Sequence, residues 1–358
     1  MNGLQLKRAR EICRLTQADL ADRLGVQQAV IAMLERGTRE PDAELLEQIS
    51  ATTGFPTSFF LDYPQYEFPL GSLLYRKFNR LPSHEKTHSH RLIEQCFTVF
   101  MRMTERLRMI PLRIPKRIED DPFTAAHLVR SSLGYDPDAP LRHLINRLER
   151  SGVIIFILPE EVVDLDAFST WVNGSIPVIV ISPGKPGDRQ RFSISHELAH
   201  LLLHQTIQGG FDAIEKEADQ FAGELLFPED AACQELVEPI TLSGLSDLKR
   251  KRGISLQALI FKALEIGVID QRQANSLRVQ MSKKGWRKKE PDALYIKPEK
   301  PRALRKMAEV LYGDPINYKK FADDMHMPVF WLKQLIEGYA GKEEFNEREK
   351  NLPSQHSF

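Results

Sequence analysis

The pattern His196-Glu197-Leu198-Ala199-His200 constrains this 358-residue chain more than any other feature. Residues four apart on an α-helix share one face, so His196 and His200 can direct two imidazole nitrogens at one Zn²⁺. Glu197 lies beside that face, where its carboxylate can take a proton from a water that the metal activates. The flanking residues are mostly apolar, which places the pattern on a buried helix. It therefore predicts a catalytic zinc site; the alternative is a core helix with two hydrogen-bonded histidines.

A catalytic zinc needs a third protein ligand and an open position for water. His204 continues the same helical face, but it lies roughly 12 Å from His196 along the helix axis, too far for both to bind one ion. We therefore expect His204 to pack nearby or to contact a ligand. The next helix, expected at 211–228, carries Glu215 and Glu217 on opposite sides of its apolar face. Periodicity alone leaves both glutamates open as the third ligand.

Composition narrows the class of protein. Lys plus Arg equals Asp plus Glu, at 49 each, so net charge points to no particular partner. Cys13, Cys96 and Cys233 form no C-x-x-C pair, which favours a reducing compartment and a metal site made of His and carboxylate. No segment reaches the roughly 20 apolar residues that a membrane span requires, and the chain begins with a charged helix instead of an apolar signal. We expect a cytoplasmic protein with no membrane partner.

The first sixty residues carry the signals of two short, successive helices. Thr16 is a natural N-cap for a helix from Gln17 to Leu24, and Gly25 ends it. A second helix is expected from Gln27 to Glu35. Two short helices joined by a tight turn predict a helix-turn-helix unit, in which the second helix enters the major groove of DNA.

Further along, the pattern combines helices with short strands. A long amphipathic helix is expected from Leu92 to Leu112, and a helical pair within 121–152. Apolar runs predict three strands, at 153–158, 167–172 and 177–182, the last of which leads into the H-E-x-x-H helix. We expect a small sheet beside that helix, with an edge strand along which an extended peptide can bind.

Residues 10–41 resemble the Xre/Cro family of repressor DNA-binding domains, through the string R-x-x-x-x-x-TQ-x-x-LA-x-x-LGV-x-Q-x-x-I-x-x-x-ERG-x-x-x-P. The resemblance implies a double-stranded DNA operator as partner, with Gln17 at a phosphate and Gln28 suited to adenine. The residues that it assigns to DNA are Gln17, Gln27, Gln28, Arg36 and Arg39. Residues 1–60 hold seven Lys/Arg against eight Asp/Glu, so a homodimer or basic residues elsewhere would have to strengthen binding. The alternative is a helix-turn-helix that contacts only protein.

Residues 191–228 resemble the ImmA/IrrE family of metallopeptidases, through R-F-S-x-x-HE-x-A-H-x-x-x-H followed by E-x-EAD-x-FA-x-x-LL-x-P. In that family the ligand glutamate directly precedes an alanine. The resemblance therefore implies Glu217 as the third zinc ligand beside His196 and His200, while Glu215 stays the alternative.

Other residues near the predicted zinc site have less certain roles. Asp219 either orients a ligand histidine or is solvated at the surface. Ala199 stands where the family usually has glycine, and its small side chain should still allow close helix packing. Arg191, Asn173 and Ser169 are near enough in sequence to stabilise an oxyanion, and nothing ranks them.

The C-terminal third reads as helices around a basic segment. Helices within 241–280 are expected to be capped by Thr241 and Ser255. Residues 283–306 carry ten Lys/Arg against three acidic residues, so they either contact phosphates or form a solvated linker. Residues 321–336 have a weak helix-turn-helix rhythm, which is insufficient to predict a second such unit.

These features together predict a mostly helical α+β protein, with an all-α helix-turn-helix domain followed by a zincin-like metallopeptidase domain with a small β-sheet. The expected parts are a DNA-binding domain, a helical connector, the peptidase domain and a basic, helical C-terminal region, at 1–62, 63–121, 122–282 and 283–358. The resemblance implies a Zn²⁺-dependent endopeptidase that cleaves a repressor or antitoxin and so regulates transcription. The alternatives are a non-catalytic regulator that senses metal or peptide, and a component of a toxin–antitoxin pair.

Overall fold

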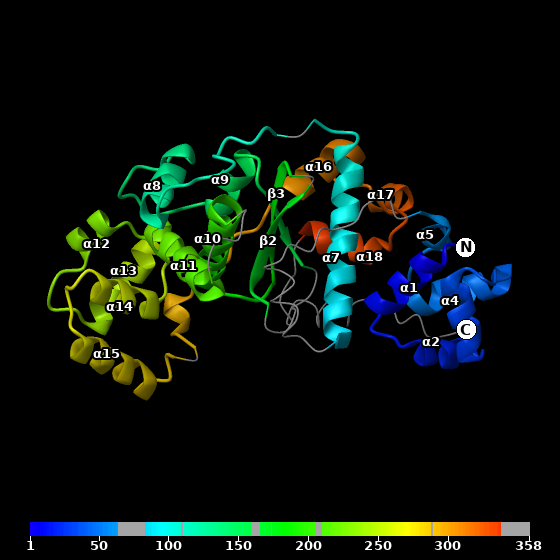
Figure 1. Ribbon diagram of the computed structural model, residues 1–358, viewed down its shortest axis with the longest axis horizontal. Coiled ribbons are helices and arrows are strands. Elements are labelled where there is room, and N and C mark those ends of the chain that lie inside the picture. Colours follow the sequence, from blue (N-terminus) through cyan, green and yellow to red (C-terminus); the bar gives the residue numbers. More distant parts are fainter. Residues whose placement is uncertain are drawn as a thin grey trace.

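A computed structural model shows a mostly helical α+β protein built around one three-stranded sheet, which confirms the expected fold class (Figure 1). The structure describes residues 1–63, 83–108, 110–158, 165–172, 174–204, 210–287 and 289–337. Among these residues, no helix has both the length and the apolar character needed to cross a bilayer.

The sheet contains the three predicted strands, β1 (Ile154–Ile157), β2 (Ala167–Val172) and β3 (Ile176–Ile181). Its order is β1-β3-β2, with β1 parallel and β2 antiparallel to β3. β3 is the central strand and is buried at five of its six positions, which explains its continuous run of Ile and Val. β2 forms one edge of this sheet.

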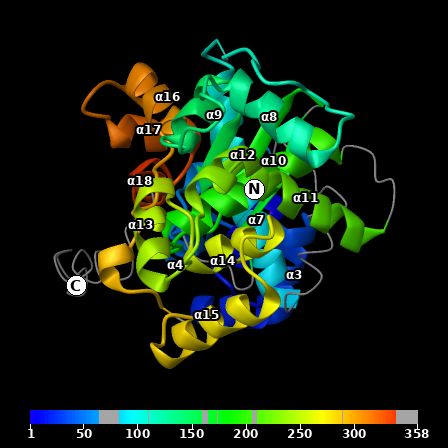
Figure 2. The same cartoon turned by 90° about the vertical axis from the view of Figure 1, so that its left-hand side faces the viewer.

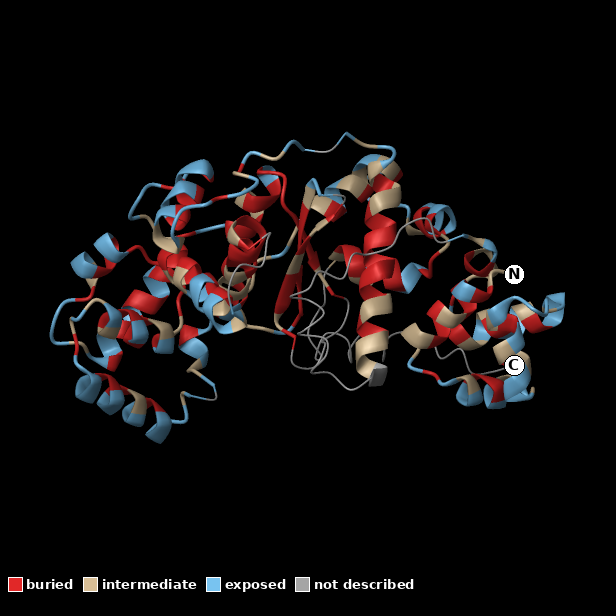
Figure 3. Cartoon of the chain, in the orientation of Figure 1, coloured by how far each residue is buried: buried red, intermediate tan, exposed pale blue. Residues whose placement is uncertain are grey.

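The two faces of the sheet pack against different helices. Side chains alternate along a strand, so Phe156 points to one face and Ile155 to the other. Helix α7 (Ser83–Thr104) covers the first face, where the rings of Phe100 and Phe156 lie 5.5 Å apart. Helix α10 (Gly187–Leu203) covers the second face. The sheet thus belongs to two hydrophobic cores at once, and Figure 3 shows buried surfaces on both sides of it.

The bounds of α7 differ from the predicted 92–112. The helix begins at Ser83, and its first turns make ion pairs with α1 and the turn after it, Glu85 with Arg14 at 3.3 Å and Arg91 with Glu11 at 2.7 Å. The prediction rested on the apolar pattern, which does not report such pairs. It ends at Thr104, after which the amides of Arg106 and Leu107 bond three residues back and the α-helical pattern stops. The expected connector therefore contains a helix that is part of the core.

The N-terminal helices confirm the predicted helix-turn-helix. Thr16 and Asp19 form a reciprocal capping box at the start of its first helix, and Gly25 ends that helix in the left-handed conformation (φ 64°). The domain consists of α1 (Gly3–Ile12), α2 (Gln17–Leu24), α3 (Gln28–Arg36), α4 (Ala43–Thr53) and α5 (Thr57–Leu61).

Further helices surround α10 and extend the molecule away from the N-terminal domain. Next to α10 lie α8 (Pro122–Ser132), α9 (Leu144–Arg150) and α11 (Phe211–Leu226). The opposite end of the molecule from α1 is formed by α12 (Glu229–Glu235), α13 (Leu242–Arg252), α14 (Leu256–Glu265) and α15 (Gln271–Lys283), as Figures 1 and 2 show. Thr241 and Ser255 cap α13 and α14 as predicted.

The chain then returns across α10 to reach the C-terminal helices. The Gly187 amide donates to Ile296 O at 2.7 Å, and Gln190 exchanges two hydrogen bonds with the Glu299 backbone. Part of the expected basic linker is thus packed against the start of α10. This returning segment contains η1 (Asp292–Leu294) and leads to α16 (Ala303–Tyr312), α17 (Tyr318–Met325) and α18 (Val329–Glu337). These last helices join the core of α7.

The close crossing of the chain at Gly187 predicts that substitution by alanine has opposite effects on stability at two helical glycines, Gly187 and Gly223. A Cβ atom at Gly187 would lie 2.6 Å from Lys297 O, whereas at Gly223 it would meet nothing within 4 Å. We expect Gly187→Ala to lower the free energy of unfolding by about 1–3 kcal/mol, because backbone must move. Gly223→Ala should raise it by about 0.5–1 kcal/mol, because alanine favours the helix. Urea denaturation measures both, and equal effects of the two substitutions would contradict the close crossing.

Candidate metal centre and nucleic-acid interface

Helix α10 brings together the two histidines and the glutamate of the H-E-x-x-H pattern. The Nε2 atoms of His196 and His200 lie 3.0 Å apart, because the two residues are one helical turn apart on one face. Glu197 is only 3% exposed, between the helix and the sheet. Two nitrogen ligands and a buried carboxylate therefore meet at one place on α10.

The third group comes from α11, which packs along α10. The Glu215 carboxylate lies 3.4 Å from His196 Nε2 and, through its other oxygen, 3.4 Å from His200 Nε2. Tetrahedral ligands about 2.0–2.1 Å from zinc are about 3.3–3.4 Å from one another. Within the described part of the chain, His196, His200 and Glu215 form a group whose ligand atoms could hold one metal ion. Both the spacing and the donor set fit zinc.

Glu217, the ligand that the family resemblance implied, points elsewhere. Its carboxylate is half exposed and lies 3.1 Å from His204 Nε2. Two residues further along a helix means roughly 200° of rotation, so Glu215 and Glu217 cannot both face the same histidines. The geometry favours Glu215, which the sequence left open as the alternative.

A second carboxylate, Asp219, lies on the same face of α11 as Glu215 and also contacts His196. Asp219 lies one turn after Glu215, and its Oδ1 is 2.8 Å from His196 Nδ1. A proton on Nδ1 can be donated to Asp219, and Nε2 is then the nitrogen that faces His200 and Glu215. The i,i+4 pair of acidic residues is therefore a sequence signal that could have selected Glu215 over Glu217.

His204 contacts the second candidate ligand, His200, as Asp219 contacts His196. Its Nδ1 lies 2.9 Å from His200 Nδ1, and its Nε2 contacts Glu217. Burial lowers the pKa of His204, which favours the neutral imidazole. His204 thus contacts a candidate ligand, as the helix geometry predicted, and Glu217 contacts His204.

The edge strand β2 carries Ser169, one of the three oxyanion candidates, and places its hydroxyl beside Glu197. Ser169 Oγ lies 2.8 Å from Glu197 Oε2, where it can donate a hydrogen bond. Two residues on, the Trp171 indole donates to Leu201 O at 2.8 Å, so the same face of β2 is attached to α10 at two points. Of the other oxyanion candidates, Arg191 pairs with Glu299, and Asn173 lies outside the described residues.

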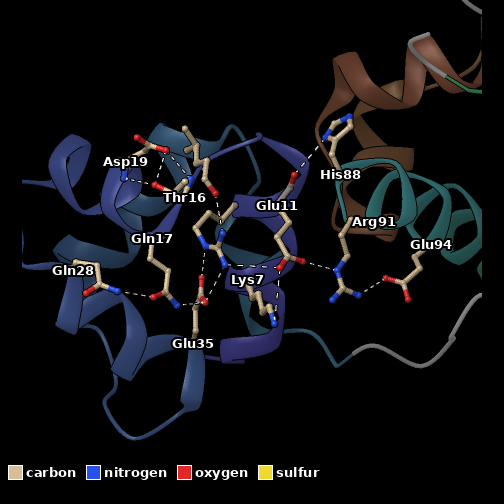
Figure 4. A network of polar contacts seen from close by, with 12 residues as sticks. Lys7, Glu11, Thr16, Gln17, Asp19, Gln28, Glu35, His88, Arg91 and Glu94 are labelled. Carbon is tan, nitrogen blue, oxygen red and sulfur yellow. Dashed lines mark hydrogen bonds and ion pairs between the residues drawn. The ribbon is translucent and has the colours of Figure 1, made fainter. Parts of the chain in front are cut away.

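The predicted DNA-reading residues gather at the N-terminus of α3. Gln27 is its N-cap and Gln28 its first residue, and both are exposed. Gln28 Nε2 donates to Gln17 Oε1 at 2.8 Å, and Gln17 Nε2 donates to Glu35 at 2.7 Å (Figure 4). Arg10 also pairs with Glu35, so a chain of contacts from Arg10 through Glu35 orients the side chains of Gln17 and Gln28.

The two predicted backbone contacts lie at the other end of α3. Arg36 is the last residue of that helix, and Arg39 follows in the next loop; both are exposed. The basic segment at 283–306 starts at the end of α15, which lies far from α2 in Figure 1.

Two comparisons with known families match the regions of the chain that carry these two candidate sites. Residues 6–60 match the helix-turn-helix family, and residues 148–263 match the IrrE N-terminal-like domain. No individual curated protein is similar enough to the chain to be matched. The chain therefore carries an Xre/Cro-type helix-turn-helix domain followed by an ImmA/IrrE-type peptidase-like domain.

Proposed function

We propose that this protein is a cytoplasmic, zinc-dependent endopeptidase that binds DNA and cleaves a protein partner, such as a repressor or antitoxin. The observation that carries the proposal is the triangle of His196, His200 and Glu215 next to a buried, hydrogen-bonded Glu197. A site that only sensed or stored metal would not need a base in that position. The three free cysteines agree with a reducing compartment.

The arrangement assigns a role to each residue of the site. A bound zinc ion would supply a Lewis acid that polarises the peptide carbonyl and lowers the pKa of water. Glu197 would take the proton from the attacking water and return it to the leaving amine. Ser169 would keep the Glu197 carboxylate in position, while Asp219 and His204 orient the two ligand histidines.

The substrate would lie along β2. This strand is an edge of the sheet and is attached to α10 by Ser169 and Trp171. An extended peptide could pair with the outer edge of β2 through backbone hydrogen bonds, which recognise any sequence. Its scissile carbonyl would then pass close to Glu197.

The N-terminal domain would bring the peptidase to a double-stranded DNA operator. We propose that Gln27 and Gln28 contact bases from the start of α3 and that Gln17, at the start of α2, contacts a phosphate. Arg36 and Arg39 would lie near the DNA backbone. Because this domain is nearly neutral, phosphate contacts from one copy are few. We propose a homodimer as the DNA-bound form.

Metal content distinguishes the two candidate glutamates. Glu215→Ala should lose most of the bound zinc, because two histidines alone hold the ion weakly. Glu217→Ala is the matched control, two residues away on the same helix, and should keep close to one equivalent. Elemental analysis of the purified proteins measures this, and zinc loss in Glu217→Ala alone would restore the family-based assignment.

Two substitutions test catalysis with the metal retained. Glu197→Gln should keep its zinc but cleave a proteome-derived peptide library about 10²–10⁴-fold more slowly, because the general base is gone. Ser169→Ala should also keep zinc and lose about tenfold or more in kcat, because a charged hydrogen bond is removed. Wild-type protein that is loaded with zinc and cleaves no peptide in the library would favour the non-catalytic, sensing alternative.

DNA recognition is tested by substituting two exposed glutamines, Gln28 on the predicted DNA face and Gln48 as a control. Gln28→Ala should weaken binding to a duplex selected from a random-sequence pool by about 1–3 kcal/mol. Gln48→Ala, an exposed glutamine on α4, should leave binding unchanged. Arg36→Ala should weaken all duplexes similarly and reduce the salt dependence by about one charge. Fluorescence anisotropy measures each affinity, and equal losses in the two glutamine variants would contradict the assigned reading face.

A further inference from the structure

The C-terminal helices repeat the geometry of the N-terminal helix-turn-helix. Helix α17 has the same length as α2, and α18 begins after the same interval as α3, at one constant sequence offset. At that offset, the N-caps are Thr16 and Asn317, and each side chain accepts a hydrogen bond from the amide three residues on. Gly25 and His326 end the first helices, and both are left-handed, with φ values of 64° and 55°.

The turn and the core of the two units also correspond. The Val26 amide bonds to Ala21 O and the Met327 amide to Ala322 O, both at 3.0 Å. Fully buried positions match in pairs, namely Leu20 with Phe321 and Ile31 with Leu332. A ten-residue helix precedes each pair, α1 in one unit and α16 in the other. The agreement of caps, turn and core defines one structural motif in two places.

We propose that residues 303–337 form a second helix-turn-helix unit, which holds the N-terminal one in place and does not read DNA itself. This stretch lies outside both family matches. Its sequence rhythm is weak because the turn glycine is replaced by His326 and the leading Thr-Gln by Asn317-Tyr318.

The two positions assigned to bases have lost their polar side chains in the second unit, and the position assigned to a phosphate is a tyrosine. Gln17, Gln27 and Gln28 correspond to Tyr318, Pro328 and Val329. Tyr318 is engaged internally, since its hydroxyl contacts Glu337 at 3.2 Å. Residues 303–337 carry five basic and five acidic side chains, so the unit has no excess charge for phosphates. An apolar, neutral recognition helix is suited to protein, not to DNA.

The turn of the second unit is instead seated on the N-terminal domain. His326 Nδ1 lies 3.2 Å from Ser58 O, and the Phe330 ring lies 3.9 Å from where a Cβ would stand at Gly54. Arg102 of α7 joins the two units, because it donates to Met325 O at 3.0 Å and also pairs with Asp62. Figure 1 shows α17 and α18 beside α7, with α17 next to α5.

The other side of the unit is anchored to the peptidase-like domain. Glu149 of α9 accepts hydrogen bonds from the amides of Arg302 and Ala303 at 2.9–3.1 Å and so caps α16. The second unit therefore bridges the peptidase-like domain and the DNA-binding domain. Meanwhile Gln27 and Gln28 on α3 stay exposed, so the bridge leaves the predicted DNA-reading face open.

Matched substitutions at equivalent positions of the two recognition helices test this division of roles. Phe330→Asp places a charge against the Gly54 contact, and Ala29→Asp places it on the predicted DNA face. Interdomain distance is measured by fluorescence energy transfer between dyes on the exposed Cys233 and on Thr38→Cys, in a Cys13→Ser background where Cys96 stays buried. DNA affinity is measured with a duplex that the wild-type protein selects from a random pool.

We expect Phe330→Asp to broaden the distance distribution and to change DNA affinity by less than about threefold, since the second unit makes no phosphate contacts. Ala29→Asp should leave the distances unchanged and weaken DNA binding about tenfold or more, because a like charge faces the phosphates. The reverse pattern, DNA binding lost and distances unchanged in Phe330→Asp, would overturn the proposal, as would an unchanged distance in all variants.

A milder substitution tests the same contact in a variant whose second unit should stay folded. His326→Gly removes the contact with Ser58 O but suits the left-handed turn, so the unit itself should stay folded. Zinc content, which depends on α10 and α11, provides the check that the peptidase-like domain is intact. With zinc retained, a broadened distance distribution supports the bridge, and a distribution identical to that of the wild type contradicts it.

Discussion

The packing of both faces of one small sheet is the constraint on which the remaining structure depends. Because side chains alternate along a strand, Phe156 and Phe168 face α7 while Ser169 and Trp171 face α10. The same strands thus position the Glu197 carboxylate on one side and, through α7, the DNA-binding domain on the other. A change in strand register by one residue would exchange the two faces and disrupt both sites together.

The candidate metal centre shows how the packing of two helices decides which carboxylates lie near the histidines. Helix α10 presents two histidines, and only the rotation of α11 against it decides which carboxylates reach them. Glu215 and Asp219 share one face of α11 and both contact His196, whereas Glu217 lies on the far side, against His204. Each histidine of the candidate centre consequently has its own hydrogen-bonding partner, Asp219 for His196 and His204 for His200.

The two helix-turn-helix units show that backbone geometry and surface chemistry are separable. Caps, turn bonds and buried positions build the same motif twice, but its partner depends on the exposed side chains of the second helix. Glutamines there suit base edges, while Val329 and Phe330 suit a protein surface. The left-handed position is occupied by Gly25, where an added Cβ atom would meet nothing within 4 Å, or by His326, whose ring contacts Ser58 O.

Local signals in the sequence by themselves determined the first helix-turn-helix, the three strands and the H-E-x-x-H helix, because caps, glycine turns and periodicity act within a few residues. They also predicted that His204 does not bind the same ion as His196, which follows from helix geometry alone. Three features depend on residues far apart in the chain: the proximity of Glu215 to both histidines, the contact of Ser169 with Glu197, and the packing of the C-terminal unit on the N-terminal domain. Only the tertiary structure decided them, since each requires the separation and rotation of two packed elements, which no local pattern encodes.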